Sequence, residues 1–327
     1  MTVIDVHTHM LTQEWIELLA QHGGAKYEVK NTAANQRAVH LYGAPFMTLL
    51  QGMWDYDMRI QKMDEAGVDI AIVSLTCPNV FFNEAVSLQA ARQVNQSMAD
   101  QQQARPTRIR WMASLPWQIP DAAVSELARA HHAGAVGVMV LANIDGRDLT
   151  DPLFAPVWEA IDRLALPVLV HPTAPQGVRD LHMQEFGLIP PIGFMFDTTL
   201  AISRMILSGF LDRYTNLKII AAHGGGALPY LAGRLDICHE KIPACASATK
   251  EKPSHYLHRI YYDTVVYELN ALKLCIEVAG SPENVLYGSD YPHNIGDMQG
   301  CLARVNALPL EQRAPIAGKN AERLFRL

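Results

Sequence analysis

Two histidines near the start of the sequence could bind a metal ion together. His7 and His9 directly follow an apolar run, Val3-Ile4-Asp5-Val6. The run predicts a β-strand, in which residues i and i+2 point to the same side, so the two imidazoles would project together from the strand end. Two converging imidazoles can coordinate one divalent metal. Taken alone, the pattern also fits two ordinary histidines.

Further chemically active side chains occur at the ends of later apolar segments. They are His171, His223, Asp263 and Asp290, which end the segments 167–171, 217–223, 260–263 and 284–290. If these segments are parallel strands of one barrel, their C-terminal ends share the face that holds the active site. Each residue alone could simply end a strand or cap a turn. Because five of the eight expected strands end in this way, the sequence predicts a shared metal site.

Apolar segments that alternate with helical ones predict the fold that positions these residues. Besides the five strands already described, strands are expected at 68–74, 109–115 and 136–140. The helices between the strands are expected at 54–67, 83–104, 121–133, 152–164 and 196–210. This alternation is typical of a parallel sheet in an α/β protein. Eight units favour a closed (β/α)8 TIM barrel. A doubly wound open sheet is the second choice, but the sequence has no GxGxxG phosphate loop.

Three stretches fall outside the regular alternation. Residues 11–55 are too long for a βα loop, and we expect an inserted flap or subdomain after strand one. Residues 176–196 resemble a lid, and the last helix, about 311–325, is expected to pack outside the barrel. No linker divides the chain, so residues 1–327 are predicted to form a single barrel domain.

Composition excludes several classes of partner. The chain of 327 residues is 49% hydrophobic and 18% charged, with a formal net charge of −6, which gives no support for nucleic acid or an anionic membrane as partner. No apolar run approaches the ~20 residues of a membrane span, and no secretory signal precedes the histidine pair. Five scattered cysteines without a CxxC pair indicate a reduced, cytoplasmic protein.

The arrangement of histidines and aspartate resembles that of the amidohydrolase superfamily. The segments HGGGALPYLAGRLD (223–236), YGSDYPH (287–293) and WDYDMRIQKMDEAGVD (54–69) are similar to the subgroup of aminocarboxymuconate-semialdehyde decarboxylase and related aromatic-acid decarboxylases. The resemblance implies one zinc ion bound by His7, His9, His171 and Asp290, with manganese as the alternative. It also implies that His223 is the acid–base group, and that Asp290 directs the reacting water with its second oxygen. No lysine matches the bridging residue of the binuclear members.

Substrate recognition departs from the pattern of this subgroup. The subgroup binds a substrate carboxylate with two arginines, but the position of the first falls near Met47, and no arginine lies between Ala38 and Asp57. The second matches Arg234, which in the subgroup comes from the neighbouring subunit, so the resemblance implies a homodimer. A single arginine, together with apolar residues of the insert and the lid (Phe46, Met47, Phe186, Phe194 and Phe196), favours a smaller or less charged small-molecule acid.

Two functions therefore stay open from the sequence. The first is a metal-dependent, non-oxidative decarboxylase of a ring-derived or unsaturated carboxylic acid. The second is a metal-dependent hydrolase of a lactone, amide or ester, because a metal-activated water beside a histidine serves both reactions. A non-catalytic binding protein on the same scaffold is the third class, and it is disfavoured since every expected metal ligand is present.

Overall fold

The structure, a computed structural model, describes residues 2–327; Met1, the first residue of the predicted domain, lies outside them. Its centre is an eight-stranded parallel sheet in the order β1-β5-β6-β7-β10-β11-β12-β13. The strands are β1 (Ile4–His9), β5 (Ile70–Ser74), β6 (Ile109–Ala113), β7 (Gly137–Leu141), β10 (Pro167–His171), β11 (Lys218–Ala221), β12 (Tyr261–Asp263) and β13 (Val285–Leu286). Every neighbouring pair in this order is parallel.

The last strand returns to the first and nearly closes the ring. The amide of Val6 donates to the carbonyl of Tyr287 at 3.0 Å, and the amide of Asp290 donates to the carbonyl of His7 at 2.8 Å. A parallel bridge joins Thr8 to Tyr291. The predicted (β/α)8 TIM barrel is therefore confirmed, and the doubly wound sheet was the wrong alternative. Closure also brings the Asp290 segment directly beside the histidines of β1.

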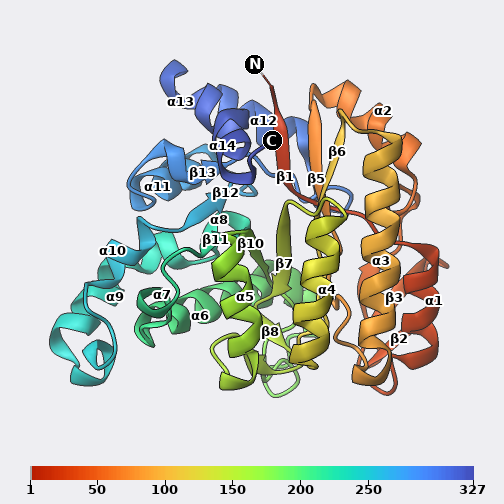
Figure 1. Cartoon of the computed structure of the whole chain (residues 1–327), viewed down its shortest axis with the longest axis horizontal. Helices are drawn as coiled ribbons and strands as arrows, with labels where there is room; N and C mark the ends of the chain where they lie inside the picture. Colours follow the sequence, from red (N-terminus) through yellow and green to blue (C-terminus); the bar gives the residue numbers. More distant parts are fainter. Residues whose placement is uncertain (1) are drawn as a thin grey trace.

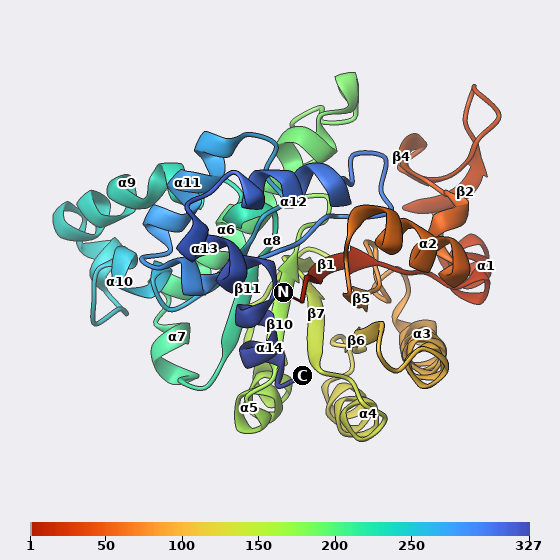
Figure 2. The ribbon, with the colours of Figure 1, turned by 90° about the horizontal axis from the view of Figure 1, so that it is seen from above.

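Helices surround the barrel (Figures 1 and 2). They are α2 (Tyr56–Ala66), α3 (Glu84–Ala104), α4 (Pro120–His132), α5 (Ala155–Leu164), α6 (Phe194–Leu207), α7 (Phe210–Arg213), α8 (Ala222–Gly225), α9 (Leu228–Lys241), α10 (Pro253–Leu257), α11 (Leu269–Val278), α12 (Met298–Asn306), α13 (Leu310–Ala314) and α14 (Asn320–Phe325). Helix α2 begins where Asp55 accepts hydrogen bonds from the amides of Asp57 and Met58 and ends at left-handed Gly67. None of the helices in residues 2–327 has the length and apolarity that a membrane crossing needs.

The insertion after strand one has a structure of its own. It contains α1 (Gln13–His22) and an antiparallel sheet of β2 (Tyr27–Asn31), β3 (Arg37–Leu41) and β4 (Ala44–Thr48), which is followed by the short helix η1 (Gln51–Met53). A small hairpin of β8 (Asn143–Ile144) and β9 (Arg147–Asp148) follows β7. The lid-like stretch holds short helical turns, at η3 (Glu185–Gly187) and η4 (Ile189–Gly193), and ends in the first turn of α6. The insertion after strand one was thus predicted correctly.

Three expected elements differ from the observed ones. The strand predicted at 217–223 ends at Ala221, because the backbone of His223 turns into the left-handed region. The strand predicted at 284–290 pairs regularly only over Val285–Leu286 and then continues towards the barrel mouth. The C-terminal helix predicted at about 311–325 is broken into α13 and α14 by a wider turn that starts at Pro315.

Candidate active site

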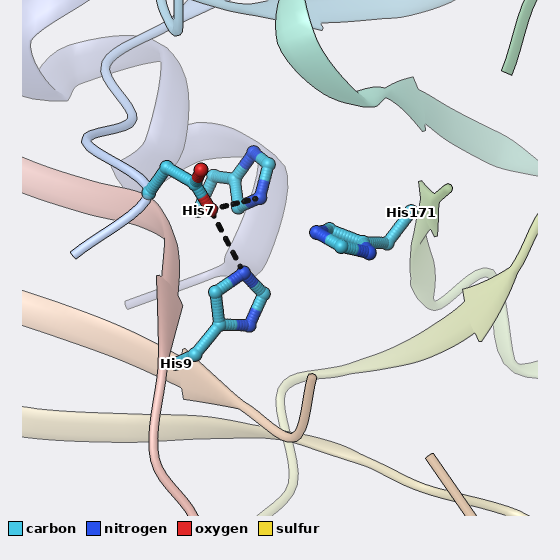
Figure 3. A group of neighbouring side chains, drawn as sticks. His7, His9 and His171 are labelled. Atoms are coloured by element: carbon cyan, nitrogen blue, oxygen red, sulfur yellow. Dashed lines mark ion pairs between the residues drawn. The ribbon is translucent and has the colours of Figure 1, made fainter. Parts of the chain in front are cut away.

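Four buried side chains converge at the C-terminal mouth of the barrel. One potential ligand atom from each lies within 4.8 Å of the others; the residues are His7, His9, His171 and Asp290. Figure 3 shows the three imidazoles turned towards a common centre. Oδ1 of Asp290 lies 3.5 Å from Nε2 of His7 and 3.2 Å from Nε2 of His9. The predicted ligands therefore meet in one place.

Hydrogen bonds fix which nitrogen of each imidazole is free. Nδ1 of His7 donates to Oδ2 of Asp263 at 2.5 Å, while Nδ1 of His9 faces the Leu75 carbonyl at 3.2 Å and Nδ1 of His171 faces the Pro172 carbonyl at 2.8 Å. Because these oxygens accept hydrogen bonds, each Nδ1 carries the proton and each Nε2 presents a lone pair to the centre. This is the tautomer that a metal ligand requires.

The centre of the cluster needs a positive charge. Within residues 2–327, the three Nε2 atoms and Oδ1 of Asp290 are buried without a hydrogen-bond partner. Burial lowers the pKa of His9 to about 3, so this imidazole is neutral. Burial would raise the pKa of Asp290, but His223 and His9 hold it well below its usual range, so this group is a carboxylate. Four converging electron-pair donors fit a divalent cation, and these residues form a divalent metal site.

His223 lies beside this cluster rather than within it. Its Nε2 is 3.7 Å from Oδ2 of Asp290, the oxygen that does not face the other imidazoles, and its buried Nδ1 has no partner among the described residues. Its backbone is left-handed, with φ 55° and ψ 48°, which is costly for a residue with a side chain. The structure therefore places His223 as predicted, next to the metal ligands, but on a strained turn after β11 and not at the strand end.

Asp263 holds this turn and the metal ligand His7 at the same time. Oδ2 accepts from Nδ1 of His7 and, at 2.9 Å, from the amide of His223. Oδ1 accepts from the amides of Gly224 at 2.9 Å and Val265 at 3.0 Å. Because Asp263 ends a predicted strand, it was expected to lie with the other polar residues of the metal site, but no role was assigned to it. In the structure it is the carboxylate that orients one ligand and the turn that carries His223.

The glycines after His223 allow a close backbone approach. A Cβ atom on Gly226 would lie 2.6 Å from the carbonyl oxygen of Met195 on α6, and this glycine has a φ of 64°. A side chain there would have to displace backbone atoms, so the glycine is required. Gly226 therefore lets the end of α8 pack closely against α6.

An apolar cavity of about 200 Å³ opens onto the metal site. Phe46 and Met47 of the insertion, Phe194 of α6 and Ile295 line it together with His171, His223 and Asp290. The expected covering of the site by the insertion is thus present. Two apolar residues expected near the site do not line the cavity, since Phe186 is 93% exposed and Phe196 is 48% exposed. Among the described residues that line the cavity, none is lysine or arginine.

Two contributors were not identified from the sequence. His293, three residues after Asp290, lines the cavity, and its Nε2 lies 2.9 Å from Oγ1 of Thr76. Arg59 of α2 is fully buried and donates to Oγ1 of Thr8 at 2.7 Å and to the His9 carbonyl at 2.5 Å, which fixes the end of β1. His293 could have been found as the last residue of the YGSDYPH segment. Nothing in the sequence indicated that Arg59 is buried beside the site, because a charged residue on a helix is usually exposed.

Arg234 lies apart from the cluster. It is exposed on α9, which Figures 1 and 2 show at the periphery of the molecule, and it does not line the cavity. Within one chain, the structure therefore does not bring Arg234 together with the metal ligands.

The chain matches the family model described as "Amidohydrolase" over residues 4–327. It belongs to the amidohydrolase family. A 2-amino-3-carboxymuconate-6-semialdehyde decarboxylase of Dictyostelium discoideum is 31% identical over 301 residues, covering 90% of this chain and 83% of the relative. The crystal structure of a 5-carboxyvanillate decarboxylase from Sphingomonas paucimobilis matches with a TM-score of 0.87 and 30% identity, over 100% of this chain and 99% of that one.

A third relative carries a metal and an inhibitor. It is a dihydroxybenzoic acid decarboxylase from Polaromonas sp. with bound manganese and 2-nitroresorcinol, which matches with a TM-score of 0.82 and 25% identity over 100% of this chain and 97% of that one. These relatives confirm the predicted family and the predicted class, a metal-dependent carboxy-lyase.

Proposed function

We propose that this protein removes carbon dioxide, without an oxidant, from an aromatic acid that has one ring and one carboxylate. The observation that carries this proposal is the position of the metal ligands and His223 at the base of an apolar cavity without lysine or arginine in its lining. The apolar lining, which includes Phe46 and Phe194, suits a ring. Since no cationic side chain of the same chain faces a second carboxylate, that group would be costly to bury there.

His223 is the proposed proton donor to the ring. In the reaction the bond between the ring carbon and the carboxyl carbon breaks, its electron pair stays on the ring carbon, and a proton takes the place of carbon dioxide. A bound divalent cation would hold the substrate's carboxylate or a neighbouring oxygen and polarise it. Nε2 of His223 lies beside Oδ2 of Asp290, which orients the imidazole for this transfer. Asp290 is the second proposed catalytic residue, because it is both ligand and orienting group.

Zinc is the proposed metal, and manganese is the alternative. Three imidazoles with one carboxylate suit zinc. Manganese is the metal named for the Polaromonas relative. Metal-free protein reloaded with one equivalent of either ion would distinguish them, and the better metal is the one that restores the higher kcat/KM. Replacement of His171 or Asp290 by Ala should abolish stoichiometric metal binding, and unchanged metal content in both variants would reject this ligand set.

The proposed active form is a homodimer. Arg234 is exposed, and among residues 2–327 no ion pair involves it, so its guanidinium is available to a second copy of the chain. In that arrangement Arg234 would reach the partner's cavity and bind the substrate's single carboxylate through a charge-assisted bidentate pair. It would then be the one cationic side chain at the cavity, which suits an acid with one carboxylate and leaves a second carboxylate without a partner.

A substrate panel tests the proposed reaction. Single-ring aromatic acids, acids with two carboxylates and a set of lactones and esters would be incubated with the metal-loaded protein. Release of carbon dioxide and of the decarboxylated ring is expected from the first group. Hydrolysis of lactones or esters without any release of carbon dioxide would overturn the proposal in favour of the hydrolase alternative, which none of the relatives described above supports.

A further inference from the structure

Arg59 of α2 contacts two chain segments that carry metal ligands, at the seam where the barrel closes. Its Nη2 donates to the carbonyl of the ligand His9, and its Nη1 donates to Oγ1 of Thr8 at 2.7 Å. The guanidinium also lies over the ring of Tyr291, the residue after the ligand Asp290, 4.8 Å from the ring centroid. One side chain therefore bridges the end of β1 and the segment that follows β13.

The contacts of Arg59 belong to one hydrogen-bond network across the seam. The carbonyl of Tyr291 accepts from the amide of His9 at 2.8 Å and from Oγ1 of Thr8 at 2.9 Å. Because the Thr8 hydroxyl gives its proton to Tyr291, a lone pair of Oγ1 is left for the guanidinium. Loss of Arg59 would leave this lone pair and the carbonyl of His9 without their buried donor.

The insertion confines the ring of Tyr291 as well. A Cβ atom on Gly52 of η1 would lie 2.8 Å from Oη of Tyr291. The ring is thus in contact with α2 through Arg59 and with the insertion at its hydroxyl end. Its position is therefore determined by elements outside the barrel strands.

Arg59 is a buried charge without a carboxylate in contact. Its side chain is 0% exposed, and its partners are a carbonyl, a hydroxyl, an aromatic ring and, at 2.9 Å from Nε, the sulfur of Met10. Burial of a guanidinium without an ion pair is costly, and a neutral side chain of similar length would avoid that cost. No neutral side chain, however, presents several donors in one rigid plane.

We propose that Arg59 is a positioning residue for the metal centre. It fixes the main chain at His9 and after Asp290, and so the separation of these two ligands, whose Nε2 and Oδ1 atoms are 3.2 Å apart. The seam itself does not depend on Arg59, because Asp5 accepts the amide and the hydroxyl of Ser289 and joins the same two segments. Variants of Arg59 should therefore fold and differ in how well they bind metal.

Metal affinity tests this role. Zinc dissociation constants would be measured on the folded proteins by competition with a chromophoric chelator. Arg59→Met should weaken zinc binding about 10- to 100-fold, the usual effect of losing a group that orients a ligand. Arg59→Lys, which keeps the charge but not the planar set of donors, should weaken it less. Thr8→Val, which removes the shared hydroxyl and keeps Arg59, should also weaken it.

The cobalt-substituted protein gives a second readout, since the visible absorption of Co²⁺ depends on the arrangement of its ligands. The spectrum of Arg59→Met should differ from that of wild type. Arg129→Met is the matched control, because Arg129 lies on the outer helix α4, pairs with Glu126 and does not line the cavity. This control should lower the melting temperature and leave the zinc dissociation constant and the cobalt spectrum unchanged.

Three results would overturn the role of Arg59. Wild-type affinity and cobalt spectrum in folded Arg59→Met would show that Arg59 serves stability alone. Tighter zinc binding in that variant would show that Arg59 acts only as a charge that repels the cation. If Arg59→Met does not fold, wild-type affinity in both Arg59→Lys and Thr8→Val would reject the role.

Metal affinity and the reaction can fail separately. The dissociation constants are measured without turnover, so the absence of carbon dioxide release in the substrate panel would leave the role of Arg59 intact. Unchanged affinity in the Arg59 variants would equally leave the decarboxylase proposal in place.

Discussion

At the residue scale, His223 differs from its neighbours in having no place among the metal ligands. His7, His9 and His171 each direct a lone pair at the common centre, whereas Nε2 of His223 faces Oδ2 of Asp290 at 3.7 Å. A group in this position can move a proton without giving up a metal bond. The turn that carries it is strained and is held by Asp263, so its position is built into the fold.

We predict that His223→Ala leaves the metal content unchanged and lowers kcat by ~10²–10⁴, the usual effect of losing a general acid–base group. KM should change much less, because the metal site and the cavity walls are retained. The measurement is steady-state kinetics with elemental analysis of the same sample. Loss of the metal would instead make His223 a ligand, and near-normal kcat would remove it from the reaction.

At the scale of elements, strand β12 contributes one carboxylate, that of Asp263, which positions two parts of the site. Asp263 receives four hydrogen bonds, from His7, His223, Gly224 and Val265. An amide in its place would turn an NH₂ group towards two of these donors. We predict that Asp263→Asn weakens metal binding about 10- to 100-fold, as is usual for a group that orients a ligand. Competition with a chromophoric chelator measures this, and an unchanged dissociation constant would contradict the role.

A second buried carboxylate ties α6 to the strand ends and predicts a pH effect. In the first turn of α6, Oδ2 of Asp197 accepts from the amide of Thr173 at 3.0 Å and from Nδ2 of Asn143 at 3.1 Å. Burial raises the pKa of Asp197 to about 6, although these hydrogen bonds oppose the increase. The folded chain therefore binds this proton more tightly than the unfolded chain, in which the pKa is near 3.9.

The contribution of Asp197 to stability is consequently complete below about pH 4 and is lost as the pH rises through 6. Relative to Asp197→Asn, whose single oxygen can accept both hydrogen bonds, wild type should lose about 2 kcal/mol of unfolding free energy between pH 4 and pH 6. Urea denaturation of both proteins at equal metal loading, at intervals across this range, measures the difference. A constant difference would mean that Asp197 titrates normally.

At the scale of the whole molecule, the exposed face of the peripheral helix α9 suggests that two copies of the chain assemble into a dimer. Of its 14 residues only Leu228 is buried, and the exposed side chains include Tyr230, Arg234 and Ile237. Contact with a second copy would cover this face and bring Arg234 to the partner's cavity. In that case each active site would combine residues of two chains.

We predict that Arg234→Ala raises KM for an acid substrate about tenfold or more without changing the metal content, because a charge-assisted hydrogen bond is lost. Mixing this variant with His223→Ala under conditions of subunit exchange should restore about a quarter of the wild-type activity, since half of the dimers are mixed and each has one complete site. No recovery despite proven exchange would reject the role in trans, and so would a monomer in sedimentation at the assay concentration.

The sequence alone determined the features that repeat along the chain. Apolar strands with intervening helices specified the barrel, because each unit must bury its own apolar face against the next. The helix predicted at 54–67 matches α2, which begins at Asp55 and ends at Gly67, because capping is local chemistry. The shared metal site was predictable because the barrel carries all strand ends to one face. Which four of these residues are the ligands was implied by the resemblance to the amidohydrolase superfamily.

Only the tertiary structure decided what depends on contacts between distant segments. Asp263 orients His7 across 256 positions of sequence, and Thr76 meets His293 across 217. No local sequence pattern predicts such pairs, because each partner alone is an ordinary polar residue. The left-handed turn at His223 was likewise missed, since its cost is offset by hydrogen bonds from another strand. Barrel closure placed Asp290 beside β1 and so completed the site.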